Sequence, residues 1–402
     1  MAKPSVLVLT STFPRWANDT VPPFVFELCR RLTPYFDLHV LAPHCPGSPT
    51  SETMEGIHVH RFRYGFTRWE GLAYGGGILP NLKRHPLLLA VIPLFLLGQM
   101  IAALRLLRRH RIRAIHAHWI LPQGLIALLS RKLAVSQADV LCTVHGSDVY
   151  GLGGRIFDYF RKRIIGRCDR VTVVSQSLFM DLARLMDGCH KMTVIPMGVD
   201  LKRRFIPPPV RDSAMSLLFV GRLEEKKGLR YLLNAMVSVV REFPEAHLTI
   251  VGEGSKSDEF KGLASSLGLT EKTTFVGALS NPELPPLFQR SNIFVFPTIV
   301  REGFGIVLVE AMGCGCAAVT TGYPALRDIA VAGESALVVP PRSAQALAEA
   351  IIRLGRDPAL RARLSETART HVRANFDWGG VTARYQGLID ELVQQSLTCE
   401  RS

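Results

Sequence analysis

The chain has 402 residues, of which 48% are hydrophobic and 20% are charged. This composition excludes an intrinsically disordered chain, and this length exceeds what one hydrophobic core usually organises, so we expect two globular domains. The formal net charge of +14 is uneven: residues 1–200 carry 24 Lys and Arg against 13 Asp and Glu, and residues 201–402 carry 24 against 21. The basic first half predicts an anionic partner there, either a membrane surface or a phosphorylated substrate.

Nucleic acid is the competing anionic partner, but the sequence has no basic-aromatic motif, no zinc-knuckle spacing and no basic helix with heptads. We therefore expect no nucleic-acid partner. None of the eight cysteines forms a CxxC pair, and several fall inside apolar runs, as reduced core thiols do. No signal-peptide pattern precedes the first expected strand, so we expect a cytoplasmic location.

Short apolar runs of the β type alternate with helical patterns along almost the whole chain, which is typical of βαβ units with parallel sheets covered on both faces. We expect strands at 5–10, 37–42, 57–62, 113–117, 139–144, 171–174 and 192–196, and then at 216–221, 246–251, 273–276, 292–296, 316–320 and 336–339. A proline-rich break at 197–215 separates the two sets.

This order predicts an α/β protein of two doubly wound, Rossmann-like domains that face each other across a cleft. We place the first domain at residues 1–200 and the second at residues 201–375. Residues 376–402 are expected to form a C-terminal helix, which packs either on the second domain or back on the first. Ligands of such sheets bind outside the carboxyl ends of the strands.

The segment 86–104, PLLLAVIPLFLLGQMIAAL, has no charged residue and is flanked on both sides by lysine and arginine. Its 19 residues just reach the length of a membrane span. A span would put strands 5–10 and 113–117 on opposite sides of the bilayer, where they could not share a sheet. Two other interpretations stay open: a helix mostly buried in the first domain, and a helix over 86–111 that lies partly in the membrane interface with its arginines on anionic headgroups.

The stretch 301–315, REGFGIVLVEAMGCG, places the carboxylate of Glu310 in an apolar run that is typical of a buried helix. A buried carboxylate costs several kcal/mol unless it is paired. Glu302 stands just before this helix, whose free backbone N–H groups form an anion-binding terminus, and carboxylates readily accept hydrogen bonds from sugar hydroxyls. The plainer alternative is that Glu310 pairs with a core arginine and that Glu302 is a solvated loop residue. Cys314 and Cys316 read as core residues.

The stretch 219–228, FVGRLEEKKG, joins the first strand of the second domain to its first helix, at the turn that faces ligands in open α/β sheets. Arginine and lysine together suit a diphosphate, and this loop offers Gly221, Arg222, Lys226, Lys227 and Gly228. The alternative is a solvated charged loop that is half acidic. The GxxxxGK[ST] and GxGxxG motifs are absent here and after the first strand, which argues against a P-loop enzyme and a dinucleotide dehydrogenase.

Three histidines close expected strands of the first half. His116 and His118 are two residues apart and point the same way on a strand, and His145 closes another strand. Three converging imidazoles would suit a metal ion. The alternatives are hydrogen bonds to sugar hydroxyls and phosphate, or ordinary core and surface histidines.

Together these stretches resemble the retaining glycosyltransferases of family 4, which have the GT-B fold. The resemblance rests first on a Glu-x7-Glu element, Glu302 to Glu310, and on the Gly-Arg…Lys-Gly loop from Gly221 to Gly228. It extends over nearly the whole chain, through residues 116–119, 145–148, 174–175, 195–200, 251–254 and 275–277.

The resemblance implies a nucleotide-diphosphate sugar as the donor, bound by the second domain. Arg222 and Lys227 would hold the diphosphate and stabilise charge on the leaving group, the role expected where no metal is used. Glu310 would bind the ribose hydroxyls, and His118 would lie by the transferred sugar. Glu302 with the amides of Gly303, Phe304, Gly305 and Ile306 would hold the donor sugar and a phosphate, and Gly221, Val276 and Gly277 would complete the donor site towards the base. No metal or other cofactor is expected.

One departure concerns the loop at 10–23, where many members of the family carry a Gly-Gly pair and this chain has none. Asp19 and Arg15 are only candidates for acceptor contacts there, and His145 and Asp148 are further candidates on the acceptor or donor-sugar side.

We expect a cytoplasmic, membrane-peripheral hexosyltransferase that moves a sugar to a lipid-linked or polysaccharide-precursor acceptor. The alternatives are a non-transferring sugar-nucleotide enzyme of the same architecture, such as an epimerase, and an inactive sugar-nucleotide-binding subunit.

Overall fold

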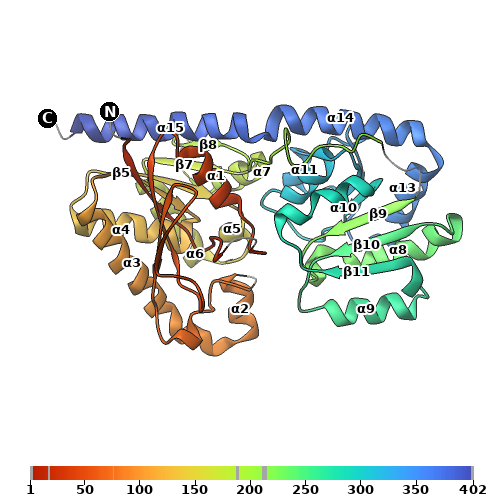
Figure 1. The fold of residues 1–402 in the computed structure, drawn as a ribbon, viewed down its shortest axis with the longest axis horizontal. Helices are drawn as coiled ribbons and strands as arrows, with labels where there is room; N and C mark the ends of the chain where they lie inside the picture. Colours follow the sequence, from red (N-terminus) through yellow and green to blue (C-terminus); the bar gives the residue numbers. More distant parts are fainter. Residues whose placement is uncertain (1–2, 17–18, 76, 187–189, 211–214, 400–402) are drawn as a thin grey trace. The chain divides into compact units, whose positions relative to one another are not determined.

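The structure, a computed structural model, describes residues 3–16, 19–75, 77–186, 190–210 and 215–399. The chain divides into two compact units, which are treated separately below (Figure 1). Unit 1 comprises Met1–Pro196 together with Val381–Ser402, and unit 2 comprises Met197–Gly380, where we predicted limits at 201 and 375. Each unit is built on a parallel or largely parallel sheet, which confirms the predicted α/β class.

Unit 1 contains an eight-stranded sheet of order β3-β4-β2-β1-β5-β6-β7-β8. Its strands are β1 Ser5–Leu9, β2 Asp37–Pro43, β3 Ser51–Met54, β4 Ile57–Phe62, β5 Ile112–His118, β6 Asp139–Val144, β7 Arg170–Val173 and β8 Met192–Val194. All seven strands predicted in this half are present. Most of them read as continuous apolar runs because both faces of the parallel sheet are covered.

The strand that the sequence reasoning missed is β3, at the edge of the sheet. Its residues, SETM, alternate between exposed and half-buried, so they form no apolar run. β3 pairs antiparallel with β4, whereas the other neighbouring strands of the sheet pair in parallel. A short polar edge strand is a common way to protect a sheet edge, and it carries little hydrophobic signal for the same reason.

The helices of unit 1 are α1 Phe24–Leu32, α2 Ile78–Arg84, α3 Ile92–Arg109, α4 Leu125–Ala134, α5 Ser147–Tyr150, α6 Arg155–Arg167 and α7 Gln176–Ala183, with short helical turns η1 Thr67–Trp69, η2 Pro86–Val91 and η3 Ile120–Gly124. α15, Trp378–Cys399, returns to this unit from the far end of the chain. The hydroxyl of Tyr385 on α15 lies 3.5 Å from the hydroxyl oxygens of Thr143 and Thr172.

The apolar segment before β5 forms η2 and α3. β1 and β5 lie on either side of it in sequence and pair in parallel, so the segment does not carry the chain across a bilayer. Among the described residues it is the one helix long and apolar enough to suit a span, but only 22% of its apolar window is buried. Phe95 and Ala103 face the unit, whereas Leu94, Leu97 and Ile101 are exposed. A mostly buried helix is therefore wrong, because apolar residues surround α3 and its packing covers only one face.

Unit 2 contains a fully parallel sheet of order β11-β10-β9-β12-β13-β14. Its strands are β9 Ser216–Val220, β10 His247–Val251, β11 Thr273–Gly277, β12 Ile293–Phe296, β13 Ala317–Thr321 and β14 Ala336–Val339, and all six were predicted. Its helices are α8 Leu229–Glu242, α9 Ser257–Ser266, α10 Pro285–Arg290, α11 Ile306–Gly313, α12 Pro324–Arg327, α13 Ala344–Arg356 and α14 Pro358–Phe376, with turns η4 Glu225–Lys227, η5 Thr270–Lys272 and η6 Asn281–Glu283.

The strand order of unit 2 is that of a Rossmann-like sheet, and it reverses direction between β9 and β12. Such a switch point is where open α/β sheets bind ligands. In unit 1 the same reversal lies between β1 and β5. Cys314 and Cys316, just before β13, are fully buried, which confirms that they belong to the core.

Candidate functional site

Two loops leave the carboxyl ends of β9 and β12, at the switch point of unit 2. Lys227 Nζ, on the first loop, lies 2.7 Å from Glu302 Oε1 on the second, and both side chains are largely buried. Thr298 Oγ1 donates a hydrogen bond to the same carboxylate oxygen over 2.9 Å. The two predicted stretches therefore meet in one ion pair, and Glu302 is not the solvated loop residue of the plainer alternative.

Gly228 allows the two loops to approach this closely. Its φ is +75°, and a Cβ atom there would lie 1.9 Å from the carbonyl oxygen of Pro297. Any side chain would push the loops apart. The N–H of Ile299 donates to the carbonyl of Lys226 over 2.9 Å and ties the loops at the same place. Lys227 thus reaches Glu302 because a glycine follows it.

The other cations of the first loop share one acidic partner. Arg222 Nη1 lies 3.2 Å from Glu224 Oε1, and Lys226 Nζ lies 2.8 Å from Glu224 Oε2. Burial acts to raise the pKa of Glu224, but the hydrogen bond from Lys226 and the charge of Arg222 bring this pKa below its usual value. Because the Arg222 side chain is 43% exposed, it remains accessible to an anionic ligand.

Glu310 lies in the middle of α11 and is 3% exposed. Its Oε1 accepts a hydrogen bond from Asn281 Nδ2 over 2.8 Å, and its buried Oε2 has no hydrogen-bond partner among the described residues. Burial raises the pKa of Glu310 to about 8, against the opposing effect of the Asn281 hydrogen bond. The direct partner is an amide and not the core arginine of the plainer alternative. A buried, unpaired carboxyl oxygen is costly and suits a hydrogen-bond donor supplied by a ligand.

The helix terminus predicted to bind an anion is the start of α11, at Ile306. Gly305 precedes it with φ +117°, and a Cβ atom there would lie 2.8 Å from Leu326 Cδ2. The Phe304 ring packs on Phe376, with 5.5 Å between ring centroids, so only the backbone of Phe304 can serve a ligand. The N-cap residue Gly305 has no side chain that could cap this end of α11, which leaves the first N–H groups of the helix to other acceptors.

The residues predicted near the base lie at the carboxyl end of β11. Val276 is 39% exposed, and Gly277 has φ +86°. The N–H of Gly252 donates to the carbonyl of Gly277 over 2.8 Å, and a Cβ atom at Gly252 would lie 2.0 Å from the carbonyl oxygen of Gly221. The loops after β9, β10 and β11 therefore pack closely, and the exposed Val276 side chain offers an apolar contact at the same edge of the sheet.

In unit 1, His116 and His118 lie on β5, and His145 follows β6. His118 Nδ1 lies 3.0 Å from His145 Nε2, whereas His116 Nε2 lies 2.7 Å from Thr143 Oγ1. Burial lowers the pKa of His116 and of His145 to about 3 and also lowers the pKa of His118, so all three are neutral at physiological pH. No group of three or more His, Cys, Asp or Glu in the described part of the chain could hold a metal ion, so this geometry does not support the metal interpretation.

The two other acidic candidates of unit 1 are engaged locally. Asp148 accepts hydrogen bonds from the backbone N–H groups of Ile120 and Gly146, both over 2.9 Å, and burial raises its pKa to about 6. Asp19 pairs with Arg15 over 2.6 Å. The Arg15 guanidinium in turn lies 4.3 Å from the centroid of the Trp16 ring. Asp148 thus shapes the loops around the histidines, and Asp19 orients an arginine.

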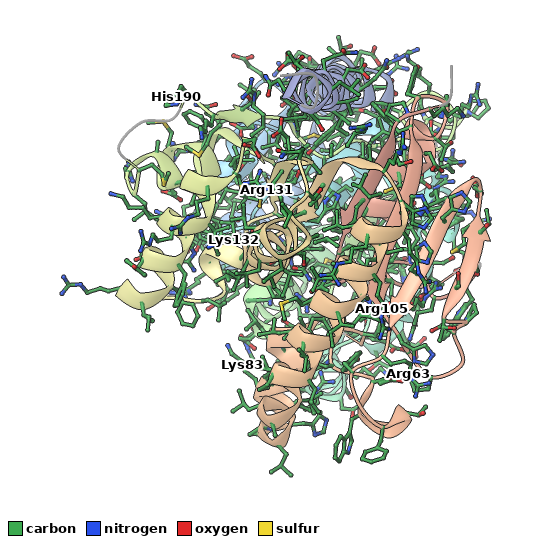
Figure 2. All side chains as sticks on the ribbon, turned by 90° about the vertical axis from the view of Figure 1, so that its left-hand side faces the viewer. Arg63, Lys83, Arg105, Arg131, Lys132 and His190 are labelled. Atoms are coloured by element: carbon green, nitrogen blue, oxygen red, sulfur yellow. The ribbon has the colours of Figure 1, made fainter. Side chains whose placement is uncertain are left out.

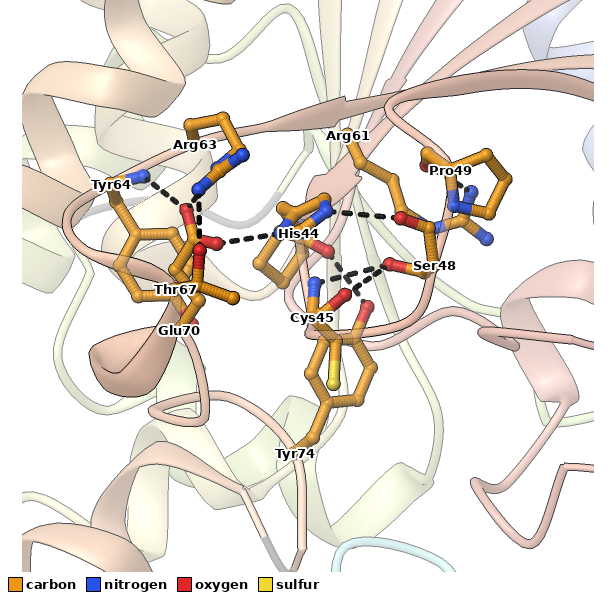
Figure 3. A network of polar contacts seen from close by, with 11 residues as sticks. His44, Cys45, Ser48, Pro49, Arg61, Arg63, Tyr64, Thr67, Glu70 and Tyr74 are labelled. Atoms are coloured by element: carbon orange, nitrogen blue, oxygen red, sulfur yellow. Dashed lines mark hydrogen bonds and ion pairs between the residues drawn. The ribbon is translucent and has the colours of Figure 1, made fainter.

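A second polar network, shown in Figure 3, was not found from the sequence. The buried carboxylate of Glu70 lies 2.6 Å from His44 Nδ1 and accepts a hydrogen bond from Arg63 Nε over 2.7 Å. His44 follows β2 and Arg63 follows β4, so the network joins loops at the carboxyl ends of these strands. Tyr74 belongs to the same cluster through its hydroxyl, which donates to the carbonyl of Pro43 over 2.9 Å. Its members are scattered between Pro43 and Tyr74 and form no motif, which is why the sequence gave no signal.

Comparison with protein families finds two matches that follow the two units. Residues 22–203 match "Glycosyltransferase Family 4", and residues 206–371 match "Glycosyl transferases group 1". A glycogen synthase of Mycobacterium tuberculosis is 30% identical over 281 residues, which is 67% of each chain. A phosphatidyl-myo-inositol mannosyltransferase of Mycolicibacterium smegmatis is 31% identical over 264 residues, covering 63% of this chain and 65% of the relative.

Solved structures show the same fold at lower identity. A sucrose-phosphate synthase from Thermosynechococcus elongatus gives a TM-score of 0.80 at 22% identity, with 97% of this chain and 99% of that chain covered. Anabaena HepE, solved in complex with UDP and glucose, gives a TM-score of 0.73 at 16% identity, with 96% and 99% covered. At these identities the likeness concerns the fold alone.

Proposed function

Since the chain belongs to family 4 of the glycosyltransferases, with the GT-B fold, we propose that it is a retaining hexosyltransferase that uses a nucleotide-diphosphate sugar. The observation that carries the proposal is the meeting of Lys227, Glu302 and the open terminus of α11 at the switch point of unit 2. Glu310 and its unpaired Oε2 stand on the same helix. Cations and a helix terminus can bind the diphosphate of a nucleotide sugar, and a carboxylate can accept hydrogen bonds from the hydroxyl groups of its sugars.

In the proposed reaction, Arg222 and Lys227 hold the diphosphate and stabilise the charge that develops as the sugar departs. Glu302 and the backbone of Gly303–Ile306 bind the donor sugar and a phosphate, Glu310 binds the ribose hydroxyls, and Val276 and Gly277 border the base. His118 contacts the transferred sugar as a neutral imidazole, a state that its lowered pKa supports. The acceptor attacks from the face that the phosphate leaves, and the phosphate oxygen takes the acceptor proton. We expect no metal or cofactor in this step.

A lipid-linked or polysaccharide-precursor acceptor and a peripheral position on the cytoplasmic face of a membrane complete the proposal. From residue 71 to residue 138 the chain has nine Lys and Arg and no Asp or Glu. Figure 2 looks onto unit 1 from the side that shows Lys83, Arg105, Arg131 and Lys132. The exposed apolar residues of α3 and its preceding turn, Leu87, Leu89, Leu94, Leu97 and Ile101, belong to the same stretch of the chain.

The neighbouring helix α4 extends this surface. α4 ends in a hollow of about 340 Å³ lined by Leu128, Arg131, Lys132, Val135, Ser136, Gln137 and Arg167, in which Arg131 also pairs with Asp169. Val135 at its rim is 83% exposed. Apolar side chains beside cations are the combination that binds an anionic lipid surface. One relative is a phosphatidyl-myo-inositol mannosyltransferase, which supports a lipid acceptor for this chain as well.

A thermal-shift screen of UDP, GDP, ADP and their hexose conjugates tests the donor site. A ligand at one hundred times its Kd stabilises a protein by about 2.7 kcal/mol. We expect one nucleotide series to shift the Tm of the wild type and to have no effect on the double variant Glu310→Ala, Arg222→Ala. The exposed double variant Arg241→Ala, Glu245→Ala, which also removes one charge of each sign, should respond like the wild type. If no nucleotide shifts the wild type, the proposed donor site is wrong.

Transfer itself is tested with a radiolabelled sugar on the nucleotide that passes this screen. Label that moves into a lipid extract or a saccharide acceptor supports a transferase. Label that is released as free sugar, with no requirement for an acceptor, would instead support the epimerase-like alternative. Binding without either reaction would favour an inactive binding subunit.

A further inference from the structure

The buried carboxylate Glu310 is held on one side only. Its Oε1 accepts the 2.8 Å hydrogen bond from Asn281 Nδ2, whereas its Oε2 is buried without a partner among the described residues. A carboxylate with one oxygen held and the other unsatisfied keeps a fixed orientation and a fixed site for one more donor. Whatever fixes Asn281 therefore also fixes the direction in which Glu310 presents Oε2.

Arg204 fixes the amide of Asn281. Arg204 Nη1 donates to Asn281 Oδ1 over 3.1 Å, so the amide stands between a guanidinium and a carboxyl group. The two ends of an amide are not equivalent, because the oxygen accepts from the cation and only the nitrogen can donate to Glu310. Arg204 thus decides which way the amide points, through a charge-assisted hydrogen bond.

The backbone that carries Asn281 is itself anchored. Ser280 and Glu283 form a capping box, in which the N–H of Ser280 donates to Glu283 Oε2 over 2.8 Å and the Ser280 side chain accepts from the N–H of Glu283. This reciprocal pair defines the start of the turn η6, where Asn281 is the first residue. The side chain of Asn281 therefore leaves from a fixed point.

The backbone that carries Arg204 is pressed against α11. The N–H of Phe205 donates to the carbonyl of Asp200 over 2.8 Å and closes a turn, and the Phe205 ring packs on Phe288 with 6.0 Å between centroids. A Cβ atom at Gly313 would lie 2.3 Å from Leu201 Cδ2, so this close approach requires the glycine. Gly313 lies three residues after Glu310 on α11. The same helix therefore carries the carboxylate and packs against the turn that contains Arg204.

We propose that Asn281 and Arg204 are positioning residues of the donor site, which hold Glu310 so that Oε2 receives a ribose hydroxyl of the nucleotide-diphosphate sugar. This inference rests on the proposed function and names two residues that the family motifs do not include. The amide acts through Glu310 and does not touch the reacting atoms. Its removal should therefore affect recognition of the ribose and leave recognition of the diphosphate unchanged.

The test compares the Kd of UDP, GDP and ADP with the Kd values of their 2′-deoxy and 3′-deoxy forms. For the nucleotide that binds, the wild type should prefer the ribose form over one of its deoxy analogues by about tenfold, as expected for a hydrogen bond to a charged group. Asn281→Ala and Arg204→Leu should weaken the ribose form and leave the deoxy form unchanged, so that the preference disappears. Arg203→Leu removes an exposed positive charge from the same turn and should keep the wild-type preference.

A second readout is the pH dependence of nucleotide binding. Hydroxyl donors favour the carboxylate form of Glu310, so binding should strengthen as the pH rises through about 8, the pKa of Glu310. Asn281→Ala removes a donor that stabilises the carboxylate, and this inflection should move to higher pH. A purely structural effect of the substitution would leave it in place.

The outcomes separate this inference from the proposed function. If no nucleotide binds the wild type, both are wrong. If the wild type binds a nucleotide and Asn281→Ala keeps both the ribose preference and the inflection, the donor site stands and the positioning role is wrong. If Asn281→Ala does not fold, Arg204→Leu and Asn281→Ser give the same comparison.

Discussion

At the scale of single residues, the carboxylate of Glu302 competes with the proposed diphosphate ligand for the ammonium group of Lys227. The carboxylate lies 2.7 Å from the ammonium group that is proposed to bind the diphosphate. Glu302→Gln removes this competing negative charge, so the Kd of the nucleoside diphosphate should fall a few-fold while sugar transfer slows. Lys227→Gln removes the cation, and the same Kd should rise by about tenfold or more. Isothermal titration and a transfer assay measure the two effects.

The two substitutions should change the Kd of the nucleotide in opposite directions. If Glu302→Gln and Lys227→Gln weaken nucleotide binding equally, the pair acts as a structural unit and neither residue faces the diphosphate. Glu259→Gln changes an exposed residue of helix α9, is a matched loss of one carboxylate and should leave the Kd unchanged.

Buried histidines make unit 1 sensitive to acid. Burial lowers the pKa of His116 and of His145 from 6.5 to about 3. Below pH 6.5 these histidines therefore bind protons in the unfolded chain but stay neutral in the folded unit. The stability from these neutral imidazoles is complete above pH 6.5 and is lost as the pH falls towards 3. The free energy of unfolding should decrease by about 1.4 kcal/mol per pH unit for each such histidine in that range.

Denaturant unfolding between pH 7 and pH 4, with hydrogen exchange of the β5 amides as a probe of unit 1, measures this slope. His116→Gln should make it shallower, because one neutral imidazole is removed. His85→Gln changes an exposed histidine and should keep the wild-type slope. A His116→Gln slope equal to that of the wild type would contradict the argument.

At the scale of elements, α3 presents leucines on a face that its packing in unit 1 leaves uncovered. Replacing Leu94 and Leu97 by glutamine should abolish co-sedimentation with vesicles of phosphatidylcholine and phosphatidylglycerol, because the apolar contact is lost, and should leave the Tm unchanged, because both side chains are exposed. Binding of the wild type should weaken with added salt, because arginines flank the apolar segment.

Met180→Gln, which changes an exposed apolar residue on α7, is the control for this experiment and should bind vesicles like the wild type. Vesicles of phosphatidylcholine alone should bind the wild type weakly, since they offer no anionic headgroup. The membrane proposal is wrong if the wild type does not sediment with anionic vesicles at low salt.

At the scale of the whole molecule, the chain ends in the unit where it begins. Val381, Tyr385, Ile389 and Leu392 on α15 are buried, and the residues from Val381 onward belong to unit 1. Fully burying one such side chain stabilises a protein by about 1.5–3 kcal/mol, so a chain that stops at Gly380 should lose the folded state of unit 1. Unit 2 keeps its residues and should keep its nucleotide-dependent thermal shift.

Graded substitutions make this prediction quantitative. Ile389→Ala and Leu392→Ala should each cost about 2–5 kcal/mol of unfolding free energy, measured by hydrogen exchange in unit 1. Asp390→Ala changes an exposed neighbour on the same helix and should have little effect. If the truncated chain shows an unchanged unit 1, the helix contributes no packing that the unit needs.

The fold was largely predictable because parallel strands buried on both faces leave continuous apolar runs, and most of the thirteen strands that were predicted have them. β3 was missed because this edge strand has four residues that alternate between exposed and half-buried and form no such run. The exposure of α3 was not predictable, since an apolar segment reads the same whether protein or solvent covers it. The exposure of α3 depends on how much of its surface the sheet and α4 cover, which the sequence of the segment does not show.

The sequence by itself determined which residues we propose for the donor site, because Glu302, Glu310, Arg222 and Lys227 stand near strand ends and a helix start and match the motifs of the family. Only the tertiary structure decided their partners. Lys227 pairs with Glu302 where Gly228 lets the two loops approach closely. Glu310 accepts a hydrogen bond from Asn281, whose amide oxygen in turn accepts one from Arg204. Spacing along a chain specifies local geometry, whereas a hydrogen bond depends on which distant loops the packing of the sheet brings within about 3 Å.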